Sequence, residues 1–157
     1  MATREAVALL ARHYAGAKLT DTSTAAYLVT VDRAGWPHAA MISMGELVVR
    51  DDSGVALALW NGTRTTGHLV RTGRATLLVV LGEHAVRSRL NVRRVALADP
   101  PHQAIPLAYF VGSIEEAAAE RAPYAQLASG ITFSLADPGS VVPRWEATRT
   151  LLNSLLG

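Results

Sequence analysis

The chain has 157 residues, and at roughly 100–200 residues per domain this length predicts a single domain. Half of the residues are hydrophobic and 18% are charged, a balance that favours a packed core and excludes a disordered chain. Cysteine is absent, which excludes disulfides, thiolate metal sites and cysteine nucleophiles, and Lys18 is the only lysine beside fourteen arginines.

Charge and hydropathy patterns bear on nucleic-acid binding, membrane insertion and localisation. The net charge is +2, the charges are interspersed and no lysine/arginine block occurs, so we expect no nucleic-acid partner. No apolar run reaches the roughly 18 residues of a membrane span, so we expect no membrane insertion. The first 14 residues lack the continuous apolar centre of a signal peptide, which predicts a cytoplasmic protein.

The first half of the chain predicts one helix and then antiparallel strands. Apolar residues at helical spacing predict an amphipathic helix over 3–17. A strand over 25–31 is followed by the turn at 32–35 and a second strand from 36, with a continuation bent at Gly45. An apolar strand over 55–60 comes next. Thr63 is then typical of a helix N-cap for a short helix over 64–71.

The second half predicts more strands and a terminal helix. Strands are expected over 75–81, 85–97 and 107–114, with a short one at 131–135. Residues 115–126 are ambiguous, because EEAAAER favours helix whereas Pro123 interrupts it. A final helix is expected over 143–156, with Pro143 in its first turn. Hairpin connections without β–α–β alternation indicate an antiparallel barrel or sandwich.

The stretch GVALALWNGTRTTGHL suggests a place for an anion. Its strand ends at Trp60, and Thr63, Arg64, Thr65 and Thr66 then stand at the start of the short helix. Free backbone N–H groups and the helix dipole favour an anion there, and Arg64 can bind two phosphate oxygens at once. The hydroxyls and the guanidinium predict a phosphate cradle. The alternative is an ordinary capped helix with Arg64 in solvent.

Three blocks carry a resemblance to a known family. They are residues 27–43 with their Gly-x-Pro turn at 35–37, residues 54–69, and the apolar strand GRATLLVVL at 73–81. The order and spacing of these blocks resemble those of the pyridoxamine 5′-phosphate oxidase-like FMN-binding split barrels. Together with the long strand that follows, the resemblance covers about two thirds of the chain. The resemblance implies a mainly β (α+β) fold, a six-stranded antiparallel split β-barrel with flanking helices. One split-barrel domain would then cover 1–157, with the barrel at 25–135.

The resemblance also implies an FMN-binding homodimer with the flavins at the subunit interface. The backbone at Met41, Ile42 and Ser43 would bond the polar edge of the flavin ring. Leu59, Trp60 and Asn61 would contact the flavin at the end of the next strand. The Ser-Arg-Lys phosphate motif of the family corresponds to Thr63, Arg64 and Thr65, so that a threonine stands in place of the lysine. The arginine and lysine that the family carries on the earlier strand are missing from HAAMISMG.

Other residues could supply the missing cations or contact the ring. Arg87 and Arg89 share one face of the long strand and could reach the anion across a dimer, or could lie on a solvated face. Trp60 could stack on the ring or fill the barrel mouth. His68 follows Arg64 by one helical turn and could bond phosphate or simply pack. The histidines form no HxxxH or HxH pair, which predicts no metal site.

The expected activity is that of a flavin-dependent oxidoreductase with an unknown small-molecule substrate, because the cofactor itself carries the redox step. The C-terminal segment PRWEATRTLLNSLLG lacks the arginine–histidine motif of true pyridoxamine phosphate oxidases, which argues against that substrate. Three alternatives remain open. A protein of the same fold could bind a deazaflavin or a haem in place of FMN. It could also be a non-catalytic flavin-binding sensor or storage dimer, or a dimer without a cofactor.

Overall fold

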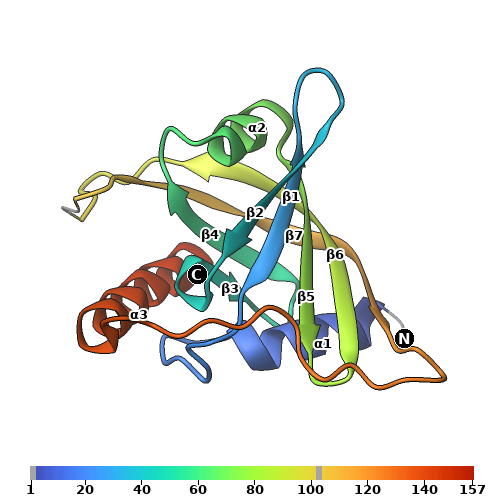
Figure 1. Ribbon diagram of the computed structural model, residues 1–157. Helices are drawn as coiled ribbons and strands as arrows, with labels where there is room; N and C mark the ends of the chain where they lie inside the picture. The colour runs from blue at the N-terminus through green and yellow to red at the C-terminus, as the bar shows by residue number, and fades with distance from the viewer. Residues whose placement is uncertain (1–2, 102–103) are drawn as a thin grey trace.

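The computed structural model describes residues 3–101 and 104–157 (Figure 1). These residues form one seven-stranded antiparallel sheet in the order β2-β1-β5-β6-β7-β4-β3. The strands are β1 (Ala26–Val31), β2 (Pro37–Ile42), β3 (Leu47–Val49), β4 (Gly54–Trp60), β5 (Arg74–Leu81), β6 (His84–Val95) and β7 (Leu107–Glu120). The helices are α1 (Thr3–Tyr14), α2 (Arg64–Thr72) and α3 (Pro138–Leu155), with a 3-10 turn, η1, at Met44–Glu46.

The sheet curls into a split barrel, which confirms the predicted fold. β2 and β3 follow one another in the chain but occupy the two opposite edges of the sheet. Only Ser43 and η1 join them, so the two edges must approach one another as the sheet closes. Figure 1 shows this curl, with α2 over one end of the barrel and α3 beside β3 and β4.

The predicted count of six strands is wrong, because the second strand divides at η1. The Ser43 backbone N–H donates to Glu46 Oε2 over 2.5 Å, and the Ser43 hydroxyl donates to the same oxygen over 3.2 Å. This capping box closes a turn where the sequence suggested a bend in one strand. β3 then pairs with β4 at the far edge.

β4 is buried on both faces, which explains its nearly continuous apolar sequence. Val55, Leu57 and Leu59 point into the main barrel core, whereas Ala56 and Ala58 face a second core that includes Leu152 of α3. The side-chain alternation of a strand places these two sets on opposite faces. α3 therefore covers the outside of β4, next to the strand end at Trp60.

The ambiguous segment after residue 114 continues as strand. β7 runs to Glu120 because β6 pairs with it along its length, as in the pairs Arg89–Glu116 and Arg87–Ala118. Buried Ala117 and Ala119 alternate with exposed Glu116, half-buried Ala118 and exposed Glu120, so the strand period prevails over the helical propensity of EEAAAER. The short strand predicted at 131–135 is reduced to a single bridge between Thr24 and Thr132.

The ends of both terminal helices differ from the prediction. α1 ends at Tyr14 rather than at residue 17, because the carbonyls at 14–16 bond the Arg149 side chain. α3 begins at Pro138 rather than at 143, with Asp137 accepting the first backbone bonds. Pro143 therefore lies inside the helix, where it lacks one donor. None of the described helices is long and apolar enough to cross a membrane.

Arg149 anchors α3 to the rest of the fold. Its side chain is fully buried and donates to the carbonyls of Met44 and Leu47 over 2.6 and 2.5 Å, in addition to those at the end of α1. Burial lowers its pKa to about 10, so the guanidinium stays charged at neutral pH. One side chain thus joins α1, η1, β3 and α3.

Candidate functional site

The junction between β4 and α2 is fixed by threonine hydroxyls. The Thr66 backbone N–H donates to Thr63 Oγ1 over 3.2 Å, which caps α2. Both hydroxyls also donate to the Trp60 carbonyl, over 2.8 Å from Thr66 and 3.2 Å from Thr63. The Thr65 side chain is only 5% exposed. In this chain these hydroxyls hold the turn together or are buried, and the phosphate cradle stays a prediction.

The remaining anion-binding groups at this junction are backbone N–H groups and Arg64. The N–H groups of Arg64 and Thr65 lie in the first helical turn, where no intrahelical partner exists. The Arg64 side chain is exposed and makes no hydrogen bond or salt bridge with the described residues. Arg64 is thus the part of the predicted cradle that remains available to a ligand.

Arg64 lines an open cleft of about 760 Å³ between α2 and the turn that joins β1 to β2. The cleft is lined by Asp32, Arg33, Ala34, Pro37, His38, Arg64, Gly67, His68 and Arg71. His68 Nδ1 lies 2.9 Å from the buried Thr30 hydroxyl, and the His68 ring meets the His38 ring edge-on at 5.4 Å. Partial burial, and then the nearby His38 and Arg71, lower the pKa of His68.

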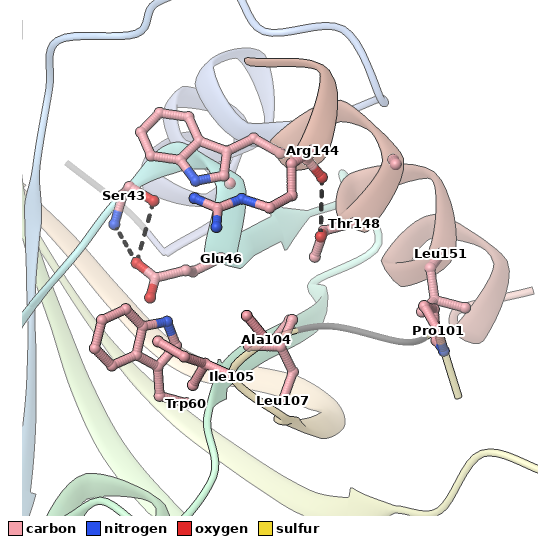
Figure 2. Close-up of a pocket in the computed structure, with 14 residues that line it drawn as sticks. Ser43, Glu46, Trp60, Pro101, Ala104, Ile105, Leu107, Arg144, Thr148 and Leu151 are labelled. Carbon is pink, nitrogen blue, oxygen red and sulfur yellow. Dashed lines mark hydrogen bonds between the residues drawn. The ribbon is translucent and has the colours of Figure 1, made fainter. Parts of the chain in front are cut away.

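A second hollow of about 690 Å³ lies beside the end of β4. Its wall contains Ser43, Gly45, Glu46, Ala58, Trp60, Pro101, Ala104, Ile105, Leu107, Arg144, Trp145, Ala147, Thr148 and Leu151. Figure 2 shows Trp60 on one wall, Arg144 across from it, and the bonded Ser43–Glu46 pair between them. Trp60 is 55% exposed, so its indole is open to a ligand. We call this hollow the tryptophan pocket.

Glu46 is the titratable group at the back of the tryptophan pocket. Burial raises its pKa, although the Ser43 bonds and the Arg144 charge act in the opposite direction. The Arg144 side chain makes no hydrogen bond or salt bridge with the described residues. The pocket therefore combines aromatic and aliphatic walls with one unpaired cation.

The structure brings together only some of the residues expected at the site. Ser43 and Trp60 line the tryptophan pocket, and Arg64 and His68 line the cleft. The other expected residues line neither hollow. Ile42 and Leu59 are buried in the core and can offer only backbone groups. Met41 is 61% exposed, and the Asn61 side chain accepts a hydrogen bond from Arg94 over 3.4 Å.

Arg87 and Arg89 line neither hollow. Arg87 forms a salt bridge of 3.2 Å with Glu120, and Arg89 forms one of 3.1 Å with Glu116. All four side chains are at least half exposed, so these pairs lie on the solvated outer face of β6 and β7. Within one chain these arginines therefore lie on a solvated face, and their contact with an anion across a dimer stays a prediction.

Sequence reasoning missed several residues of the two hollows. Arg71 follows Arg64 by seven residues, a helical spacing visible in TRTTGHLVRTG. Arg33 and His38 flank the β1–β2 turn, and no sequence signal places that turn beside α2. Arg144 belongs to α3, whose position depends on the distant Arg149 contacts.

Comparisons with known proteins agree with this fold. No family model matches the chain. The uncharacterized protein YclD of Bacillus subtilis is 34% identical over 122 residues, which cover 77% of each chain. The fold resembles an FMN-binding protein from Syntrophomonas wolfei, with a TM-score of 0.52, 19% identity and coverage of 80% of this chain and 90% of that one.

Two further solved structures share the fold. A candidate pyridoxamine 5′-phosphate oxidase from Lactobacillus delbrueckii has a TM-score of 0.53 and 20% identity, with coverage of 72% and 89% of the respective chains. The conserved hypothetical protein Rv2991 of Mycobacterium tuberculosis has a TM-score of 0.54 and 11% identity, with coverage of 83% and 94%. At these identities the likeness extends to the fold alone: the chain shares the split-barrel fold of these three structures.

Proposed function

The chain belongs to the same protein family as YclD of Bacillus subtilis, and on that premise we propose that it binds FMN and acts as a flavin-dependent oxidoreductase. One observation carries the proposal: β2 runs from one hollow to the other. Pro37, at its start, lines the cleft, and Ser43, just past its end, lines the tryptophan pocket. Six strand residues span roughly 20 Å, a length comparable with that of an extended flavin mononucleotide.

The chemistry of the two hollows matches the two ends of FMN. The flavin ring is flat and largely apolar, and the tryptophan pocket offers the exposed indole of Trp60 beside aliphatic side chains. The phosphate is an anion, and the cleft offers Arg64 with the first-turn N–H groups of α2. The fold likeness to an FMN-binding protein supports the same assignment.

In this proposal the residues of the chain bind and orient the cofactor. Bound flavin would supply the redox chemistry. Trp60 would fix the ring plane, the backbone near Ser43 would bond its polar edge, and Arg64 would hold the phosphate. The aliphatic residues Ala58, Leu107 and Leu151 would limit the access of water to the ring.

We also propose that two copies of the chain pair through the outer face of β2, β1 and β5. In this face, directly paired residues form the rows Met41–Tyr27–Leu78 and Ala39–Val29–Thr76, which are apolar or aromatic except for Thr76. An antiparallel sheet usually exposes polar residues on its solvent side, so an apolar outer face supports a protein partner. A second copy is the expected partner, because homodimers are the commonest closed assemblies.

Flavin binding is tested by adding FMN to the purified protein and following quenching of flavin fluorescence and the absorbance bands of bound flavin. We expect saturable binding with one flavin per chain and weaker binding of riboflavin, which lacks the phosphate. A protein that binds neither flavin contradicts the proposal. Titration with deazaflavin and with haem in the same assay discriminates the alternative cofactors.

Catalysis is tested separately from binding. An oxidoreductase that uses NADH or NADPH should bleach the bound flavin when the nucleotide is added without oxygen, and the colour should return with air. A flavin that binds tightly but stays oxidised with both nucleotides favours the passive flavin-binding dimer instead.

A further inference from the structure

Three arginines line the cleft between α2 and the β1–β2 turn. Arg64 and Arg71 lie on one face of α2, at positions separated by two helical turns. Arg33 comes from the turn between β1 and β2, and all three line the same cleft. We call this set the arginine cleft. His38 and His68 also line it and add two ring nitrogens that can donate to an anion.

The charges in the arginine cleft are not balanced by the protein. Asp32 is the one carboxylate among the residues that line the cleft. Its Oδ1 accepts the backbone N–H groups of Ala34 and Trp36 over 2.9 and 2.8 Å, so this carboxylate holds the shape of the turn. None of the salt bridges among the described residues includes Arg33, Arg64 or Arg71.

An anion would relieve this imbalance. Three guanidinium groups around one open cleft repel one another, and the attraction of each group to a bound dianion offsets that repulsion. Arg71 also donates to the Val31 carbonyl at the end of β1, so its side chain is directed toward the turn that carries Arg33. The planar guanidinium suits a phosphate because it offers two parallel N–H bonds.

The position that holds a lysine in the resembling family cannot supply this charge. Thr65 occupies it, and its side chain is buried beneath α2. Arg87 and Arg89 form salt bridges with glutamates of β7 and do not line the cleft of this chain. The arginine cleft is thus the cationic hollow beside the start of β2, where the proposed binding mode places the phosphate of FMN.

From this geometry we propose that Arg33 and Arg71, together with Arg64, bind the 5′-phosphate of the flavin. The inference rests on the proposed FMN binding. It adds two phosphate ligands from outside the helix-start motif, one of them on the β1–β2 turn. The turn therefore becomes part of the cofactor site.

The test compares FMN and riboflavin, which differ only in the phosphate. The variants are Arg33→Ala, Arg71→Ala and the double variant, with Arg93→Ala as the control on an exposed position of β6 that lines neither hollow. Each phosphate-binding arginine should contribute roughly tenfold to FMN affinity, so the double variant should lose about a hundredfold. Riboflavin affinity should stay unchanged in every variant, and inorganic phosphate should compete with FMN only where the cleft is intact.

Arg33→Ala is the cleaner of the two single variants, because Arg71 also bonds the Val31 carbonyl. Equal thermal melting of wild type and variants shows that folding is preserved. The inference is overturned if the double variant binds FMN as tightly as wild type does. Failure of the proposed function gives a different result: the wild-type protein then binds neither FMN nor riboflavin.

Discussion

Arg64 is the residue on which the proposed phosphate site depends most directly. Replacing it by alanine should weaken FMN binding by about 1.5–3 kcal/mol, roughly ten- to a hundredfold, because a charge-assisted hydrogen bond is lost. Riboflavin affinity should not change. Flavin fluorescence titration measures both values, and an FMN affinity equal to that of wild type would show that the phosphate lies elsewhere.

Thr65 gives a second prediction at the level of one residue. Alignment with the family motif suggests that Thr65→Lys should tighten FMN binding by restoring the missing lysine. The structure predicts the opposite outcome, because the side chain at this position is 5% exposed and a lysine there must bury its charge or distort α2. We expect about 1–3 kcal/mol of lost stability in urea unfolding and no gain in FMN affinity. Tighter FMN binding by this variant would contradict the observed burial.

At the scale of elements, α3 depends on the buried side chain of Arg149. Arg149→Met should lower the free energy of unfolding by about 3–5 kcal/mol, since the carbonyls of Met44, Leu47 and Tyr14 lose the guanidinium that donates to them. Urea unfolding followed by circular dichroism measures the loss, and Arg93→Met on the exposed face of β6 is the control. A loss below about 1 kcal/mol would mean that packing alone holds α3 in place.

The elements also show what the sequence could and could not predict. Local patterns were sufficient to place six of the seven strands along the chain and to predict α2, whose cap at Thr63 and end at Gly73 are encoded in adjacent residues. They failed where partners distant in the chain decide, as in the continuation of β7 to Glu120 through its pairing with β6. The same limit applies to the site. Arg64 stands in a local motif, but Arg33 lines the same cleft only because the fold places the β1–β2 turn beside α2.

At the scale of the whole molecule, the outer face of β2, β1 and β5 should hold two copies together. Met41→Glu and Leu78→Glu each place a charge on this face and should shift the protein toward a monomer. Val70→Glu is the matched control, because Val70 is an exposed apolar residue on α2. Light scattering coupled to size exclusion measures the mass. Wild-type protein that elutes as a monomer at all concentrations would contradict the proposed dimer.

The position of β4 in the sheet has a consequence for how the chain assembles. β4 pairs along its whole length with β7, from Gly54–Ser113 to Trp60–Leu107, so its main partner follows it by about 50 residues. Pairing at such a separation is slow, because a long loop must close before any bond forms. The end of β4 that carries Trp60 therefore acquires its final position late. A growing chain can present the complete tryptophan pocket only after β7 and then α3, which supplies Arg144 and Leu151, have been synthesised.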